Sequence, residues 1–349
     1  MQSALVTIVV VPRERFSIAP HSLESIYQHT TGAFELVYVD GASPRAVSRW
    51  LDQAATQYGF RLLRTRQYLM PNQARNIGLA EVKTKYVVFI DNDVIVWPGW
   101  LEPLIECAEE TGAWAVGPVI CIGKPGEDCI HVTHGELHIT ESHGRRELDE
   151  EMCHINEHYH DIKHQLIRAP CDFVEFHCML ARRDAFERVG NLDEKIMTTR
   201  EHIDFCLAIE KAEGTVFFEP TSCVTHVPPW HSFSYLDLPY YLLRWNDKWA
   251  YESVQHFVRK WGLPDDTQKR LTEWILPHRR AVFDPVERAF RPALLRRYIG
   301  RPFTQLLAAA MERLLVPLAR RKGRASAALV RTAPDMANSA TRITDHSVL

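Results

Sequence analysis

The stretch KYVVFIDNDVIV at residues 85–96 sets five apolar residues directly before an Asp-Asn-Asp triplet. Residues 86–90 are all aromatic or β-branched, which is typical of a buried strand. Asp91 and Asp93, one residue apart at the end of such a strand, would repel each other in a poorly solvated site. A divalent cation would remove that repulsion, and Mg²⁺ and Mn²⁺ prefer carboxylate oxygens with water and substrate phosphates. Taken alone, the triplet also fits a solvated turn, so the neighbouring segments decide between the two interpretations.

The chain before this stretch alternates apolar runs with helix-like segments. We expect strands at 5–11, 34–39 and 60–64, and helices at about 17–29, 44–58 and 72–81. This β-α-β-α-β-α-β order predicts a doubly wound, mostly parallel sheet, in which ligands bind beyond the carboxyl ends of the strands. Asp40 ends the second strand as Asp91 ends the fourth, so two acidic strand ends favour a binding site over a turn.

The motifs between residues 4 and 226 resemble, in order and spacing, those of the family-2 glycosyltransferases, which have the GT-A fold. The similar segments are the first strand with Pro12, ELVYVDGAS at 35–43, ARNIGL at 74–79, the Asp-x-Asp at 91–93, FERVGNLDE at 186–194 and REHIDFC at 200–206. The resemblance implies an inverting transferase that moves a sugar from a nucleotide diphosphate sugar, with uridine as the expected nucleoside. The acceptor would be a hydroxyl of a glycan, a lipid-linked saccharide or a small molecule.

The resemblance also implies roles for individual residues. Asp91 and Asp93 would hold Mn²⁺ or Mg²⁺, with Asp93 as the direct ligand, and His226 is either a further ligand or a structural histidine. The residues expected to line the nucleotide-sugar site are Pro12, Glu14, Asp40, Arg75, Asn76, Asp91 and Asn92. For Asn76, a structural hydrogen bond of its helix is an equally open interpretation.

The general base is the point at which the chain departs from the family. His202 stands where the family has its basic Asp, and histidine titrates near neutral pH, so it is a competent base. Glu201 and Asp204 lie three apart, which puts both on one helix face. We favour His202 or Glu201 over Asp204. The alternative is that Glu201 is only a helix N-terminal acid and His202 a surface side chain.

Residues 129–164 are polar and rich in histidine, with Cys129 and Cys153 among them. A zinc site is conceivable, but no Cys-x-x-Cys pair or compact four-ligand spacing is present. An insertion over the acceptor site is the preferred interpretation. Trp114 and His177 are candidate sugar platforms, and a core role is at least equally open for Trp114. Strands are expected at 172–178, 214–220 and 222–227.

The domain organisation follows from these segments. We expect a catalytic domain at 1–232, with a nucleotide-sugar half at about 1–120 and an acceptor half at about 121–232, a helical region at 233–324 and a disordered tail at 325–349. Aromatic residues at helical spacing within 236–262 favour packing over sugar binding. The helix expected at 303–319 combines one apolar face with basic residues up to 324. It can lie at a membrane interface, dock on the catalytic domain, or contact a second subunit in a homo-oligomer.

Composition limits the remaining classes. A formal net charge of -3 gives no indication of nucleic-acid binding, and no apolar run approaches the roughly 20 residues that span a bilayer. The eight scattered cysteines indicate free thiols in a reducing cytoplasm, at the inner membrane face if the basic helix binds lipid.

Two other functions stay open. One is a non-catalytic nucleotide-sugar or glycan-binding relative. The other is a nucleotidyltransferase, which the absence of glycine from VPRERF at 11–16 disfavours.

Overall fold

The computed structural model describes residues 4–142, 145–229, 234–283, 287, 295–324 and 330–332. Within them one mixed sheet has the strand order β10-β12-β6-β11-β4-β1-β2-β3-β13, with β5 beside β12 and β7 beside β6. Its strands are β1 (Val6–Val11), β2 (Phe34–Gly41), β3 (Arg61–Thr65), β4 (Tyr86–Asp91), β5 (Val94–Val96), β6 (Ala115–Ile122), β7 (Ile130–Val132), β10 (Ala169–Cys171), β11 (Cys178–Arg182), β12 (Val216–His226) and β13 (Val330–Thr332). Strands β1 to β4 pair in parallel, whereas β11 runs antiparallel to β4 and β6.

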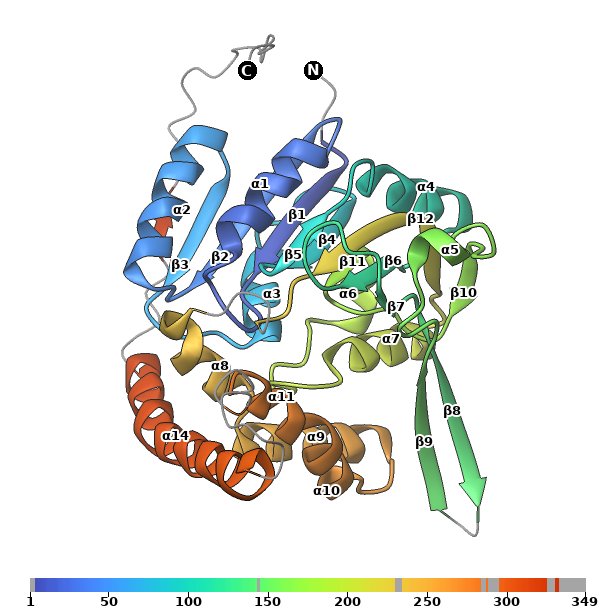
Figure 1. Cartoon of the computed structure of the whole chain (residues 1–349). Helices are drawn as coiled ribbons and strands as arrows, with labels where there is room; N and C mark the ends of the chain where they lie inside the picture. The colour runs from blue at the N-terminus through green and yellow to red at the C-terminus, as the bar shows by residue number, and fades with distance from the viewer. Residues whose placement is uncertain are drawn as a thin grey trace.

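Helices cover both faces of this sheet (Figure 1). The helices concerned are α1 (Ala19–His29), α2 (Arg45–Tyr58), α3 (Pro71–Leu79), α4 (Leu101–Thr111), α6 (Ala185–Val189) and α7 (Glu201–Lys211). Alternate residues of β1 enter two different cores: Val10 packs with α1, α2 and α4, and Val9 packs with α3 and α7. A strand buried on both faces is apolar at nearly every position, and the hydroxyl of the one polar residue of β1, Thr7, is hydrogen-bonded to that of Thr84 at 2.8 Å. The predicted α/β class is confirmed, and the predicted strands and helices before residue 91 begin and end within two residues of the observed ones.

Two strand predictions in the second half were wrong. The segments at 214–220 and 222–227 form the single strand β12, which shifts register between Glu219 and Cys223. Pro220 lies in that shift, and proline has no backbone N–H for the ladder, so a bulge accommodates it. The segment at 172–178 is mostly irregular, and β11 begins only at Cys178.

The strand register brings the site residues to one edge of the sheet. Val11 pairs with Asp91, so the loop after β1 begins beside the end of β4. Because β11 runs antiparallel to β4, its amino-terminal end lies at the carboxyl end of β4. The Asp91 N–H donates to the carbonyl of His177, 3.1 Å away. Residues 86 positions apart in the chain thus become direct neighbours.

Helix α3 lies unusually close to β1 because of one glycine. A Cβ at Gly78 would lie 2.2 Å from Val9 Cγ1, a distance that no real side chain tolerates. This close approach lets Arg75, one turn earlier in the helix, reach the end of β4.

The C-terminal helices lie below the carboxyl edge of the sheet (Figure 1). They are α8 (Leu238–Arg244), α9 (Asp247–Trp261), α10 (Thr267–Arg270), α11 (Leu276–Ala281) and α14 (Arg301–Arg324). The buried aromatic residues Tyr240, Trp245 and Phe257 confirm the packing interpretation of the aromatic spacing. Tyr240 Oη donates to the carbonyls of Pro12 (3.2 Å) and Leu69 (2.8 Å), which ties α8 to the loop after β1.

The apolar side chains that were predicted to share one face of the C-terminal helix lie in different surroundings. Leu307 and Ala308 of α14 pack against α8, whereas Leu306 and Leu314 are 72% and 67% exposed. The tail was expected to be disordered, yet Val330–Thr332 forms a strand antiparallel to β3. None of the helices that the structure describes is long and apolar enough to cross a bilayer.

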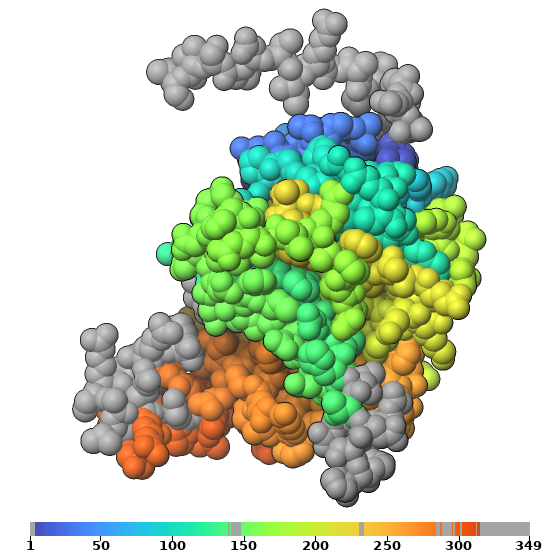
Figure 2. Space-filling view, turned by 90° about the vertical axis from the view of Figure 1, so that its right-hand side faces the viewer, coloured from blue at the N-terminus to red at the C-terminus, as the bar shows by residue number. Residues whose placement is uncertain are grey.

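A hairpin of β8 (Gly135–Ser142) and β9 (Arg145–Met152) projects from the body (Figure 1). In the view from the right-hand side of Figure 1, the green residues of this part of the chain lie directly above the orange helical region (Figure 2). Glu150 at the hairpin base forms ion pairs with Arg200 and Arg270, each at 2.5 Å. The predicted insertion is thus tied to the C-terminal helices.

Candidate active site

The acidic end of β4 is completely enclosed. Asp91 and Asp93 are at most 1% exposed. Asp91 accepts a hydrogen bond from Arg75 at 2.8 Å, and Arg13 Nε lies 3.4 Å from its other oxygen. Burial raises the pKa of Asp91, and the two arginines only partly offset this. Burial would also raise the pKa of Asp93, but His226 and Arg13 outweigh it and hold that pKa below the usual range.

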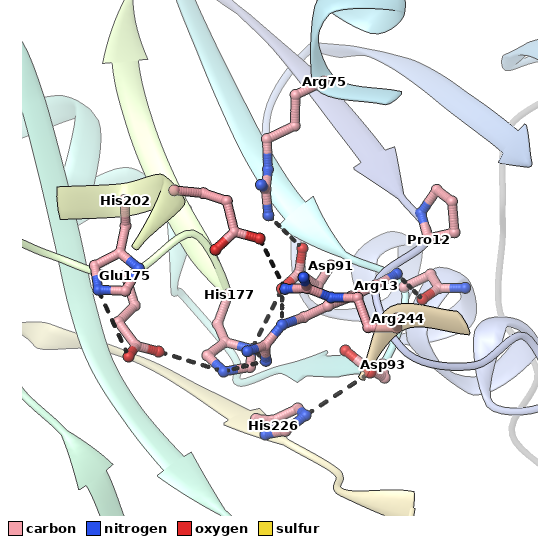
Figure 3. A network of polar contacts seen from close by, with 12 residues as sticks. Pro12, Arg13, Arg75, Asp91, Asp93, Glu175, His177, His202, His226 and Arg244 are labelled. Atoms are coloured by element: carbon pink, nitrogen blue, oxygen red, sulfur yellow. Dashed lines mark hydrogen bonds and ion pairs between the residues drawn. The ribbon is translucent and has the colours of Figure 1, made fainter. Parts of the chain in front are cut away.

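Asp93 belongs to a buried triplet with His177 and His226, in which one ligand atom from each residue lies within 4.8 Å of the others (Figure 3). Among the described residues, neither carboxylate oxygen of Asp93 and neither ring nitrogen of His226 has a hydrogen-bond partner. Buried polar atoms are normally hydrogen-bonded, so orphaned atoms that converge need an explanation. Carboxylate and imidazole donors that face one another fit a divalent cation.

His177 was predicted only as a sugar platform. The structure instead places its ring 4.1 Å from that of His226, centroid to centroid, and its Nδ1 3.4 Å from Asp91 Oδ2. Its position follows from the pairing of β11 with β4, and no motif within 172–178 predicts how these two strands align.

Two residues of the predicted donor site have their hydrogen-bonding groups occupied by the protein. Asp40 accepts from Arg64 Nε at 2.7 Å and from the N–H of Ser43 at 2.9 Å. Asn76 accepts from the N–H of Leu192 at 3.0 Å and donates to its carbonyl at 2.9 Å. For Asn76 the structure therefore favours the structural alternative, whereas its neighbour Arg75 reaches Asp91.

The loop after β1 is built on Asn92. Its Oδ1 accepts from the N–H of Arg13 at 3.3 Å, and its Nδ2 donates to the carbonyl of Arg15 at 2.8 Å. Pro12 and Glu14 lie in the same loop, and Glu14 is only 3% exposed. Arg13 is the residue of this loop that faces the large pocket.

A pocket of about 640 Å³ opens between the hairpin base, the start of α7 and the C-terminal helices. It is lined by Arg13, Leu148, Asp149, Glu150, Met152, Phe173, Glu175, Thr198, Thr199, Arg200, Glu201, His202, Trp245, Val258, Leu263, Pro264, Asp265, Asp266, Lys269, Arg270, Glu273 and Trp274. The sequence predicted a helical region at 233–324 without a part in the site, but its side chains form one wall of this pocket.

His202 enters the pocket beside a carboxylate that the sequence interpretation missed. Glu175 Oε1 lies 4.0 Å from His202 Nε2, and Oε2 lies 3.3 Å from His177 Nε2 (Figure 3). Burial lowers the pKa of His202, while Glu175 and Glu201 act in the opposite direction. Burial would raise the pKa of Glu175, but His131 and His202 outweigh it and keep that carboxyl ionised.

The other two predicted bases are placed differently. Glu201 lines the pocket but accepts a hydrogen bond from Arg244 at 2.7 Å. Although burial would raise its pKa, Arg244 and Arg75 lower it. Asp204 does not line the pocket, and its carboxylate accepts from Lys260 and from the indole of Trp261, both at 2.8 Å.

The histidines of 129–164 do not gather at one place. His131 joins the site, 3.5 Å from Glu175. His158 and His160 form ion pairs with Asp128 at 2.9 and 2.8 Å on the surface. On the hairpin, His138 lies with exposed carboxylates.

Known proteins share this sequence pattern and fold. The sequence model of Glycosyl transferase family 2 matches residues 7–190, more than half of the chain. The chain is 26% identical over 227 residues to an uncharacterised protein, y4gI, of Sinorhizobium fredii (64% of this chain, 24% of that protein). It is 29% identical over 156 residues to the pre-mycofactocin glycosyltransferase of Mycobacterium tuberculosis (45% of this chain, 30% of that protein).

The chain thus spans less than a third of the length of these relatives. Its fold is similar to that of GalNAc-T7, solved with UDP, GalNAc and Mn²⁺, at a TM-score of 0.52 and 16% identity, covering 77% of this chain and 53% of that one. The expected family is confirmed: the chain belongs to glycosyl transferase family 2.

Proposed function

We propose that the protein is an inverting glycosyltransferase that moves a sugar from a nucleoside diphosphate sugar, with uridine as the nucleoside, to an acceptor hydroxyl. The observation that carries this is the pairing of two features at one edge of the sheet. One is the buried carboxylate of Asp93, which accepts no hydrogen bond among the described residues and lies 3.7 Å from His226, and the other is His202 in the adjoining pocket. The family membership and the UDP and Mn²⁺ bound to GalNAc-T7 support the same assignment.

Asp93 and His226 would hold a divalent cation, with Asp91 beside them. When bound, the cation supplies the positive charge that stabilises a departing diphosphate. Arg13 would contribute further charge, since its side chain faces the pocket and its guanidinium can donate two parallel hydrogen bonds to a phosphate.

His202 would accept the proton of the acceptor hydroxyl. Burial keeps the pKa of His202 below its ordinary value, so the imidazole is neutral and able to take a proton at pH 7. The carboxylate of Glu175 would orient the ring and stabilise the imidazolium as it forms. Attack from this side, opposite the leaving diphosphate, inverts the anomeric carbon. Glu201 is the second candidate base, weakened by its ion pair with Arg244.

The acceptor would bind in the pocket between the hairpin and the C-terminal helices. A volume of about 640 Å³ lies within the range of sites for small molecules. Aromatic side chains such as Trp274 and Phe173 line it together with polar ones such as Asp149 and Lys269. That mixture suits a saccharide or another hydroxylated ring.

The test begins with thermal unfolding of the protein with nucleoside diphosphates, with and without Mn²⁺. A ligand that binds only the folded state raises the melting temperature. We expect a Mn²⁺-dependent rise with UDP, followed by turnover of a UDP-sugar. No rise with any nucleotide, from a well-folded sample, would contradict the proposal.

Two substitutions then assign the roles. Asp93→Asn should abolish both turnover and the Mn²⁺-dependent rise, and near-normal turnover would exclude the cation role. His202→Ala should lower kcat by about 10² or more while donor binding persists. His158→Ala removes an exposed histidine as the matched control. Unchanged turnover in His202→Ala would shift the base to Glu201.

A further inference from the structure

His177 is a buried histidine at the centre of the site for which the proposed reaction has assigned no role. Its side chain is 2% exposed and lies between Asp93 and His226 on one side and Glu175 on the other (Figure 3). Its ring contacts Arg13 and Glu175, and its centroid lies 4.1 Å from that of His226.

The two carboxylates near His177 lie beside different ring nitrogens. Nε2 lies 3.3 Å from Glu175 Oε2, and Nδ1 lies 3.4 Å from Asp91 Oδ2. A histidine that binds a metal commonly donates its other N–H to a carboxylate, which fixes the tautomer. Once Arg13 has moved away from Nε2, Glu175 is placed for that outer contact, which leaves the Nδ1 lone pair on the side of the acidic end of β4.

Asp93 and His226, whose Oδ2 and Nε2 atoms lie 3.7 Å apart, complete a ligand set around it. Both oxygens of Asp93 and both ring nitrogens of His226 are buried without hydrogen bonds among the described residues. One ligand atom from each of Asp93, His226 and His177 lies within 4.8 Å of the others. A cation of ordinary ligand distance can be reached by all three after small side-chain movements.

We propose that His177 is the third protein ligand of the divalent cation, beside Asp93 and His226. This rests on the cation site of the proposed function and selects among its metals. Imidazole suits divalent transition metals, whereas Mg²⁺ demands oxygen ligands and retains its waters. A site with two imidazoles and one carboxylate therefore binds Mn²⁺ in preference to Mg²⁺.

Arg13 competes for the same histidine. Its Nη1 lies 2.9 Å from Nδ1 and 2.5 Å from Nε2 of His177, and its Nε lies 3.4 Å from Asp91. A cation that uses the Nδ1 lone pair has to displace this guanidinium, which is 19% exposed and can turn into the pocket. Binding of the cation would thus free Arg13 for the diphosphate.

The experiment measures cation affinity by calorimetry, without donor or acceptor. The metal-free protein and its variants are titrated with Mn²⁺ and with Mg²⁺, and EDTA-treated samples are first checked for folding by circular dichroism. We expect His177→Gln to weaken Mn²⁺ binding by about 10-fold or more, on the scale of losses that follow disruption of metal-site residues. Mg²⁺ binding should change less, so the preference for Mn²⁺ narrows. Arg13→Gln should strengthen Mn²⁺ binding, since it removes a competing charge.

Controls separate the possible failures. His138→Ala removes a histidine of the exposed Glu136–His138–Glu151 group and should leave the Mn²⁺ affinity of the buried Asp93–His177–His226 site unchanged. If Asp93→Asn does not alter Mn²⁺ affinity, the cation site itself is wrong. If Asp93→Asn abolishes binding but His177→Gln does not weaken it, the cation site stands and His177 is not a ligand. Should His177→Gln fail to fold, Glu175→Gln tests the same arrangement through the outer contact.

A spectroscopic measurement counts the ligands directly. Electron spin echo modulation of bound Mn²⁺ should show two coupled imidazole nitrogens in the wild type and one in His177→Gln. A single nitrogen in the wild type would overturn the proposal.

Discussion

Replacing Arg75 with methionine tests how the acidic edge of the sheet is held together. Arg75 and Asp91 are 2% and 1% exposed, and Nη2 lies 2.8 Å from Oδ1. The guanidinium also stacks over Phe176, 4.2 Å from the ring centroid, and donates to Asn72 at 3.1 Å. Methionine preserves most of the apolar stem but removes the charge and these hydrogen bonds.

The expected cost follows from burial. Removing one partner of a buried ion pair typically costs about 3–5 kcal/mol, because the remaining charge is left uncompensated. Two features place Arg75→Met at the lower end of that range. Arg13 Nε remains 3.4 Å from Asp91, and burial already raises the pKa of Asp91, so the carboxyl can take up a proton. We therefore expect a loss of about 3 kcal/mol, or about 4 °C in Tm for a chain of this size.

The assay is thermal and urea unfolding at pH 7 in EDTA, followed by circular dichroism. Arg182→Met is the matched control, because its partner Asp184 lies 2.6 Å away but the pair is 29% and 55% exposed. An exposed pair of this kind contributes about 0–1 kcal/mol. If Arg75→Met costs no more than Arg182→Met, the buried pair does not stabilise the edge and the reasoning is refuted.

Three further predictions concern the base, its partner and the packing of α3. The acid limb of kcat/KM should lie below pH 6.5, the usual pKa of histidine, because burial lowers the pKa of His202 and the rate falls only when this imidazole becomes protonated. An acid limb above pH 6.5 would contradict the assignment of His202 as the base. Glu175→Gln should move the acid limb to lower pH and lower kcat, because it removes a negative charge that raises the pKa of His202. An acid limb that does not move would show that Glu175 does not act through His202. Gly78→Ala should destabilise the protein by about 1–3 kcal/mol through overpacking, because the new Cβ would lie 2.2 Å from Val9 Cγ1. Replacing an ordinary helical glycine with alanine stabilises a helix, so a stabilised variant in urea unfolding would refute the close approach of α3 to β1.

Local sequence patterns were enough to predict the first half of the fold. The runs at 6–11 and 86–90 are buried on both faces of the sheet, and such strands carry their signal in nearly every residue. The alternation with helices then fixed the carboxyl edge as the place where Asp91 and Asp93 end β4. These are local patterns, and the family motifs over 7–190 reinforce them.

Which side chains surround the carboxyl edge of the sheet depends on tertiary packing. His177 reaches Asp91 through the antiparallel register of β11 and β4, and Glu175 reaches His202 through an irregular segment. The lining of the pocket by Trp274 and its neighbours depends on how the C-terminal helices pack. Such contacts join residues far apart in the chain, and their partners are selected by register and packing. Strand periodicity reports which face a residue occupies but not which residue lies opposite, so the sequence located the site without its complete ligand set.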